Sequence, residues 1–185
     1  MNKKQIRRDY ENIDYIDEKG KVRTRVEYIG KYYKPDDDKE YKIHKNKVTV
    51  FSFILFALYI ASMIVYSEAM KAMYFALPFA GLIFPLFFYL INVYKLHFKK
   101  LPLRQEDYDS MFSTFKIWCV VGVVLGLAAS IGYVFKMVTE GASTIDILPV
   151  SAVFLFLLFS VLIFRSIVKT KINAVGEGKK FISDN

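Results

Sequence analysis

The sequence predicts an all-α integral membrane protein with four transmembrane helices, both termini in the cytoplasm (N-in/C-in) and a small cytoplasmic N-terminal segment. Two observations predict this fold class. First, the 185-residue chain contains four stretches without Asp, Glu, Lys or Arg, namely 48–67, 72–94, 117–135 and 147–164. Each is close to the ~20 residues that a helix needs to cross a hydrocarbon core of about 30 Å. Second, the basic residues are unevenly distributed among the segments that connect these stretches.

Composition favours lipid over water as the surroundings of these stretches. Apolar residues make up 54% of the chain, whereas soluble chains average roughly 45–50%. In the stretch 147–164, 14 of the 18 residues are Leu, Ile, Val or Phe, so its insertion as a helix is favourable by on the order of 4–8 kcal/mol. The alternative is a soluble protein with four buried helices, but no amphipathic element would remain to cover them.

Lysine and arginine set the predicted orientation, because short cytoplasmic loops carry an excess of them. Grouped by alternating sides of a membrane, 24 of these residues fall in 1–47, 95–116 and 165–185, and two fall in 68–71 and 136–146. The first group of segments is therefore predicted to be cytoplasmic. The chain is predicted to be a multi-pass protein of the cell membrane.

The cytoplasmic loop 95–116 carries a compact basic cluster, predicted to lie at the membrane surface. Its members are Lys95, Lys99, Lys100 and Arg104. They are expected to contact the anionic inner leaflet of the lipid bilayer. Orientation and lipid contact account for the net charge of +8, so no nucleic-acid partner is predicted.

Residues 1–47 form the predicted cytoplasmic N-terminal segment. Their 14 basic residues, ten acidic residues and six tyrosines are not the composition of a disordered tail. The stretch 15–35 predicts a possible β-hairpin with a turn at Gly20. Its second strand would place four side chains on one face: Val22, Thr24, Val26 and Tyr28. Asp36 is the expected N-cap of a helix that continues into the first span, 48–67.

The second span, 72–94, contains Pro78 and Pro85, which are seven residues apart and hence on about the same face. Each proline removes a helical hydrogen-bond donor, so a helix kink is predicted. Two interpretations stay open. The kink is either a packing feature that neighbouring helices satisfy, or part of a broken helix that lines a cavity. Asn92, near the end of this span, is expected to form a hydrogen bond to another helix.

The third span, 117–138, carries small residues four positions apart, at Gly122, Gly126 and Ser130. Such a strip lets two helix backbones approach closely. It predicts helix packing either within the chain, with Ala57 and Ala61 of the first span as the partner strip, or with a second chain. Self-association or a protein partner at the third span is therefore predicted.

The fourth span, 147–164, completes the predicted transmembrane domain at 48–168. A cytoplasmic C-terminal tail at 169–185 follows this domain. Cys119 is the single cysteine, so an intrachain disulfide is excluded.

The chemistry visible in the sequence predicts a protein that is not an enzyme. It contains no P-loop, no GxSxG, no HExxH and no paired-cysteine motif. No catalytic residue, cofactor-binding residue or metal ligand is therefore assigned. No Asp, Glu, Lys, Arg or His side chain lies inside the four charge-free stretches, which argues against ion-coupled transport.

The predicted function is that of a non-catalytic accessory, scaffold or assembly partner in a membrane complex. The alternative is a small homo-oligomeric transporter or channel for a neutral or amphiphilic solute, lined by the helix that contains Pro78 and Pro85. Twenty lysines against six arginines, with many Ile, Phe, Tyr and Asn, are typical of an AT-rich bacterial genome.

Overall fold

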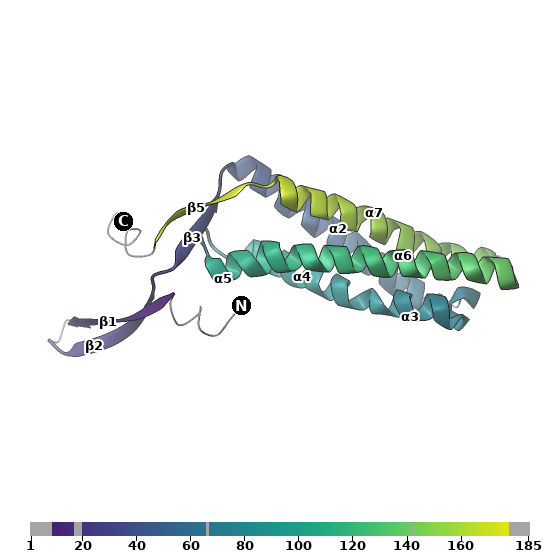
Figure 1. The fold of residues 1–185 in the computed structure, drawn as a ribbon, viewed down its shortest axis with the longest axis horizontal. Coiled ribbons are helices and arrows are strands. Elements are labelled where there is room, and N and C mark those ends of the chain that lie inside the picture. The colour runs from purple at the N-terminus through teal and green to yellow at the C-terminus, as the bar shows by residue number, and fades with distance from the viewer. Residues whose placement is uncertain (1–8, 17–19, 66, 142, 178–185) are drawn as a thin grey trace. The chain divides into compact units, whose positions relative to one another are not determined.

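The computed structural model describes residues 9–16, 20–65, 67–141 and 143–177 (Figure 1). The chain divides into two compact units. The bundle unit comprises residues 37–98 and 111–170, and the sheet unit comprises residues 1–36, 99–110 and 171–185. Each unit is described by itself below.

The bundle unit is built from long helices joined by short turns. Its α-helices are α2 (Asp38–Ile64), α3 (Met73–Gly81), α4 (Ile83–Phe98), α6 (Thr114–Glu140) and α7 (Ile147–Lys169). Two 3₁₀ turns, Glu68–Lys71 and Thr144–Asp146, connect them at one end, which we call the loop end. The opposite end, where α2 begins and α7 ends, is called the basic end. Asp109–Ser113 forms one π-helical turn before α6.

Four helical segments are long and apolar enough to cross a membrane, as the sequence predicts. Within the described residues they are Asp38–Ile64, Met73–Phe98, Gln105–Glu140 and Thr144–Lys169. Each segment extends beyond its charge-free stretch at one end or at both. α2 begins ten residues before the first stretch because Asp37 caps it, with its side chain accepting a hydrogen bond from the Lys39 amide at 2.7 Å. The expected cap, Asp36, instead accepts a hydrogen bond from Asn173.

The second span is interrupted rather than continuous. α3 ends at Gly81 and α4 begins at Ile83, so the break falls at Leu82. Pro85 has no N–H to donate to the Gly81 carbonyl, which removes the hydrogen bond that would continue the helix. Pro78 lies inside α3 without ending it.

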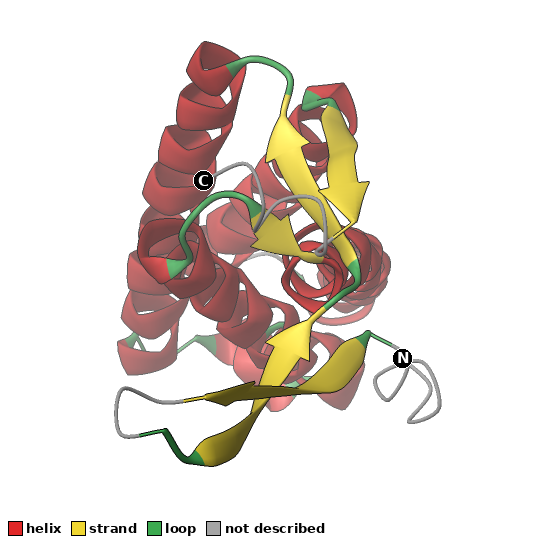
Figure 2. Cartoon of the chain, turned by 90° about the vertical axis from the view of Figure 1, so that its left-hand side faces the viewer, coloured by secondary structure: helices red, strands yellow, loops and turns green. Residues whose placement is uncertain are grey.

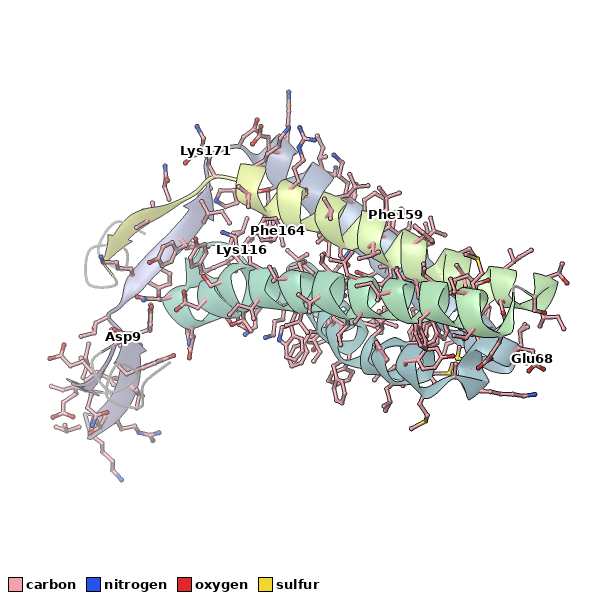
Figure 3. All side chains as sticks on the ribbon, turned by 45° about the vertical axis from the view of Figure 1, so that its right-hand side comes forward. Asp9, Glu68, Lys116, Phe159, Phe164 and Lys171 are labelled. Atoms are coloured by element: carbon pink, nitrogen blue, oxygen red, sulfur yellow. The ribbon has the colours of Figure 1, made fainter. Side chains whose placement is uncertain are left out.

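Large side chains fill the interior of the bundle. α2 packs against α4 and α7, and α6 packs against α3, α4 and α7. The largest fully buried side chains include Phe75, Phe79, Leu86, Tyr89 and Phe156. The outer faces of the same helices carry apolar side chains as well, which Figure 3 shows projecting from the bundle.

The sheet unit begins with the hairpin that the sequence suggests. β1 (Tyr10–Ile16) pairs with β2 (Val22–Tyr28) in antiparallel register, with Tyr10 opposite Tyr28 and Ile16 opposite Val22. The first strand begins earlier than the predicted stretch 15–35. Because side chains alternate along a strand, Val22, Thr24, Val26 and Tyr28 share one face.

A second sheet joins three distant parts of the sequence. β3 (Lys31–Pro35) is the central strand, with β4 (Leu103–Arg104) on one side and β5 (Ile172–Glu177) on the other, all antiparallel (Figure 2). From the sequence alone, these parts are predicted to be an N-terminal segment, a loop and a tail. The structure places them in one folded unit, which also contains the short helix α5 (Gln105–Tyr108).

Candidate functional site

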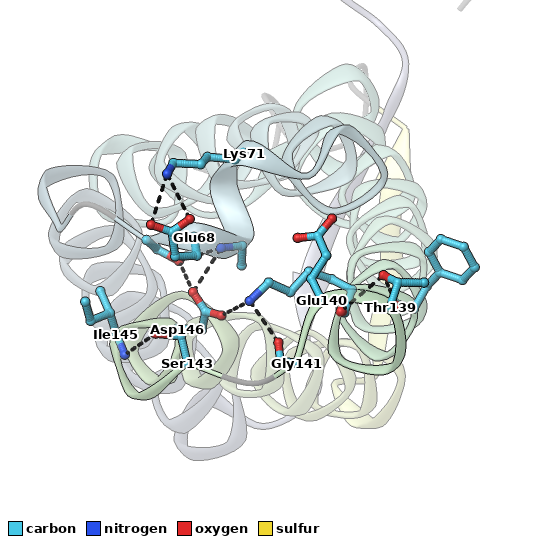
Figure 4. A network of polar contacts seen from close by, with 12 residues as sticks. Glu68, Lys71, Thr139, Glu140, Gly141, Ser143, Ile145 and Asp146 are labelled. Atoms are coloured by element: carbon cyan, nitrogen blue, oxygen red, sulfur yellow. Dashed lines mark hydrogen bonds and ion pairs between the residues drawn. The ribbon is translucent and has the colours of Figure 1, made fainter.

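The loop end of the bundle contains a buried ion pair. The Lys136 ammonium lies 2.8 Å from Asp146 Oδ2, and the two side chains are 4% and 0% exposed. The other carboxylate oxygen, Oδ1, accepts hydrogen bonds from the Ser67 hydroxyl at 2.7 Å and from the Ala69 amide at 2.9 Å (Figure 4). Lys136 also donates to the Gly141 carbonyl at 3.1 Å. The Asp146 carboxylate therefore links the two helix connections at the loop end, one before α3 and one before α7.

Local sequence explains how the groups of this network meet. Ser67 caps the turn Glu68–Lys71, and Asp146 lies at the N-terminus of α7, where the helix dipole favours a negative charge. Lys136 lies on the buried face of α6, seven residues after Ala129 and four after Gly132. Both carboxylate oxygens are fully engaged, so the network acts as a structural clamp. From the sequence, Lys136 and Asp146 are predicted to lie in a loop. The spacing of Lys136 from the buried residues of α6 is the signal that could have predicted its burial.

Hydrogen bonds between buried side chains and neighbouring helices link the bundle internally. Tyr89 of α4 bonds to Ser160 of α7, with 2.8 Å between the two oxygens. Asn92 donates to the Met111 carbonyl at 2.7 Å, so this side chain bonds across helices as predicted. Both contacts pair a buried donor in an apolar interior, where an unpaired group is costly. The Oδ1 atom of Asn92 is buried and has no hydrogen-bond partner among the described residues.

The small residues of α6 pack within the chain. A Cβ atom on Gly122 would lie 2.8 Å from the Phe156 ring, and a Cβ atom on Gly126 would lie 2.7 Å from the Leu157 side chain. The partner helix is therefore α7, and the expected strip of Ala57 and Ala61 on the first span is wrong. Ser130 is half-buried and donates to the Gly126 carbonyl of its own helix at 2.9 Å. Each i+4 step drifts by about 40° around a helix, which carries Ser130 to the edge of the buried face.

Gly132 makes the closest backbone approach in the bundle, and sequence reasoning missed it. A Cβ atom there would lie 2.2 Å from the carbonyl oxygen of Tyr74 in α3. Pro78, four residues after Tyr74, has no N–H to donate to this carbonyl. Pro78 leaves the Tyr74 carbonyl without a helical partner. This carbonyl lies against Gly132, which has no side chain to exclude it. Pro85 is buried and Pro78 is half-buried.

The predicted basic cluster has its members in different environments. Lys99 forms an ion pair with Asp107 at 2.9 Å. Arg104 lies in β4, where its guanidinium carbon is 5.5 Å from the centre of the Tyr28 ring. Lys100 is exposed, and Lys95 of α4 is half-buried. Part of this cluster therefore stabilises the sheet unit.

Tyr28 is the centre of the sheet unit. It is 5% exposed, donates a hydrogen bond to the Lys31 carbonyl at 2.9 Å and accepts one from the Gln105 amide at 3.0 Å. Burial raises the pKa of the Tyr28 phenol above its ordinary value. Tyr28 therefore joins the hairpin to the loop that contains β4, and the Tyr10 hydroxyl joins them as well by donating to Glu106.

A groove of about 470 Å³ lies at the basic end of the bundle, between α2 and α7. Its lining includes the apolar side chains of Phe51 and Leu162 and the basic side chains of Lys47, Arg165 and Lys169. His44 also lines it, and its Nδ1 lies 2.9 Å from the Ser166 hydroxyl. The opposite ring nitrogen, Nε2, is buried and has no hydrogen-bond partner in the described part of the chain.

Among residues 9–16, 20–65, 67–141 and 143–177, no group of three or more His, Cys, Asp or Glu side chains could hold a metal ion. Cys119 is buried in α6. In the comparisons with known proteins, no family model, no curated protein and no solved structure matches this chain.

Proposed function

We propose that the chain is an integral membrane protein with both ends in the cytoplasm, and that it serves as a non-catalytic accessory or scaffold protein in a membrane complex. The proposal has three parts, which are insertion, orientation and partner binding. A different observation supports each part.

The outer surface of the bundle supports insertion. Large apolar side chains are exposed on every long helix, for example Phe53 on α2, Phe84 on α4, Ile131 on α6 and Phe154 on α7. Soluble monomers rarely expose contiguous apolar surface beyond a few hundred Å². Lipid tails would cover such a surface without cost, because they are equally apolar.

The sheet β4–β3–β5 supports the orientation. Its three strands come from before the first span, from between the second and third spans, and from after the fourth span. Strands that pair in one sheet must lie on the same side of a bilayer. That requirement holds if all four helical segments cross, and it agrees with the distribution of lysine and arginine.

Orientation can be tested with single cysteines and a maleimide that does not cross membranes. Thr144→Cys at the loop end is expected to react in intact cells, whereas Lys100→Cys is expected to react only after the cells are opened. The native Cys119 is buried and contributes little background. Labelling of both positions from the outside would contradict the proposed orientation.

The scaffold role is carried by one observation, the exposed apolar face of the β1–β2 hairpin. Ile16, Val22 and Val26 are 72%, 70% and 66% exposed. They lie on one face, because Ile16 is opposite Val22 in the hairpin register. In the described part of the chain, β1 and β2 pair only with each other, so each strand keeps one open edge. An apolar face with open strand edges is suited to binding a partner by strand addition.

The interior of the bundle favours this role over a channel. Phe75, Phe79, Tyr89 and Phe156 are fully buried between the helices. Gly122, Gly126 and Gly132 leave no room for even one added carbon without displacement of a neighbour. A single chain packed in this way provides support for partners more readily than a path for a solute.

Partner binding can be tested with the double variant Val22→Thr/Val26→Thr, which keeps the β-branched shape and the net charge. Full-length tagged protein is extracted in mild detergent, and co-purifying proteins are quantified. The double variant is expected to reduce partner affinity roughly tenfold, since each lost methyl contact contributes about 0.8 kcal/mol.

The matched control is Val175→Thr, the same change at an exposed valine of β5 in the same unit. It is expected to leave partner recovery unchanged. The scaffold role is rejected if repeated purifications of the wild-type chain recover only the chain itself.

A further inference from the structure

We propose that the groove between α2 and α7 binds one anionic phospholipid, with the phosphate at Lys47, Arg165 and Lys169 and an acyl chain along Phe51 and Leu162. This inference rests on the insertion part of the proposed function. It adds a specific ligand and a specific site.

Two helix faces form the groove. Along α2, His44, Lys47 and Phe51 follow one another at helical spacing, and along α7, Leu162, Arg165 and Lys169 do the same. The two helices run in opposite directions, so the apolar ends of both faces meet, as do the basic ends. Phe51, which lines the groove, stacks on Phe159 with ring centres 4.6 Å apart.

The charge of the groove selects an anion. Three basic side chains line it, and Glu40 is the one acidic residue among the lining residues. Within the described residues, no ion pair neutralises Lys47, Arg165 or Lys169. Arg165 and Lys169 are four residues apart in the last turns of α7, so both can reach one phosphate.

The position of the groove matches the depth of lipid phosphates. Lys47 directly precedes the charge-free stretch 48–67, and Arg165 directly follows the stretch 147–164. In a helix that spans the bilayer, the first charged residue beyond the apolar stretch lies at the headgroup level. Basic pockets between membrane helices on the cytoplasmic side are known to hold anionic headgroups.

A buried polar group provides a further sign of a built site. His44 is 1% exposed and lines the groove, while its Nε2 has no hydrogen-bond partner in the described part of the chain. Buried polar atoms are rarely left unpaired. The Ser166 hydroxyl, which also lines the groove, pairs with the opposite ring nitrogen, Nδ1, so the ring is held in place at the groove wall.

The test measures lipid retention on purified full-length protein in detergent by native mass spectrometry. Phosphatidylglycerol and phosphatidylcholine with the same acyl chains are added in equal amounts. Wild-type protein is expected to retain one phosphatidylglycerol. The triple variant Lys47→Gln/Arg165→Gln/Lys169→Gln is expected to bind it roughly 100-fold more weakly, since each basic group near an anionic surface contributes about a fivefold factor.

The control is the triple variant Lys42→Gln/Lys45→Gln/Lys116→Gln, which removes the same charge at the same end outside the groove. It is expected to retain the lipid as the wild type does. A second variant, Leu162→Trp, fills the apolar part without changing charge and is expected to reduce retention as well. It keeps the test decisive if the groove triple variant does not fold.

Three results would overturn the proposal. They are equal retention by both triple variants, equal retention of phosphatidylcholine, and displacement of the lipid by inorganic phosphate at equal concentration, which would indicate a free-phosphate site. Lipid retention is measured on purified protein in detergent. Its result therefore does not decide the maleimide labelling or the recovery of partner proteins, which are separate measurements. Loss of the groove site therefore leaves the scaffold proposal standing, and the reverse also holds.

Discussion

Asp146→Ala is expected to lower the free energy of unfolding by about 3–5 kcal/mol, the range observed when one partner of a buried ion pair is removed. The substitution leaves the Lys136 ammonium buried without a counter-charge and removes the acceptor of the Ser67 hydroxyl. The Ala69 amide loses its hydrogen bond to Asp146 and keeps only the longer one to Ser67 Oγ, at 3.2 Å. The measurement is unfolding of the purified protein by SDS in mixed micelles. Trp118, the single tryptophan, reports unfolding because its ring stacks on Phe88 at 3.9 Å.

The matched control for Asp146→Ala is Glu68→Ala at the same end of the bundle. Glu68 also forms an ion pair, with Lys71 at 2.8 Å, but both side chains are about half exposed. Exposed pairs contribute roughly 0–1 kcal/mol. The double variant Lys136→Met/Asp146→Leu is expected to recover much of the lost stability, because no lone charge remains buried. Equal losses for Asp146→Ala and Glu68→Ala would show that the clamp is not a buried ion pair.

Gly132→Ala is expected to lower the free energy of unfolding by about 1–2 kcal/mol. The added carbon would lie 2.2 Å from the backbone oxygen of Tyr74, so α3 and α6 must separate. Overpacking of this kind typically costs 1–3 kcal/mol, and the helix-propensity gain of about 1 kcal/mol for Gly→Ala offsets only part of a clash with backbone. The same SDS titration measures the loss.

Gly126→Ala provides the comparison for Gly132→Ala. Its added carbon would meet the flexible end of the Leu157 side chain, which can turn aside. Strain and propensity then nearly cancel, and stability is expected to stay within about 1 kcal/mol of the wild type. The larger change Gly126→Ile is expected to disturb the monomer itself, since this strip packs on α7. An equal effect of the two alanine variants would contradict the close approach at Gly132.

The helices could be predicted from the sequence because the signal for them is local. Four charge-free stretches of sufficient length mark four long helices, and the missing donor of Pro85 explains the break at Leu82. The hairpin was visible for the same reason, since alternation and the Gly20 turn lie within one short stretch. Signals that lie within a few residues are read directly from sequence periodicity.

The missed features depend on contacts between distant residues. The backbone approach at Gly132 requires the Tyr74 carbonyl, which is on another helix. Lys136 is close in sequence to Asp146, but its burial requires the turn that holds Ser67 and Ala69. β4 has only two residues and β5 carries no strong alternation, so their pairing with β3 has no local signal.

The pairing of β3 with β5 also constrains the order in which parts of the protein can fold during synthesis. The central strand precedes all of the long helices in the sequence, whereas its outer neighbour Ile172–Glu177 follows them. The sheet can close only after every intervening helix has emerged and been placed. Closure with such large sequence separation is slow, so during synthesis β3 is an exposed template for other strands. The sheet β4–β3–β5 is therefore expected to form after the long helices have folded, so its strands stay unpaired for longer than any other element of the sheet unit.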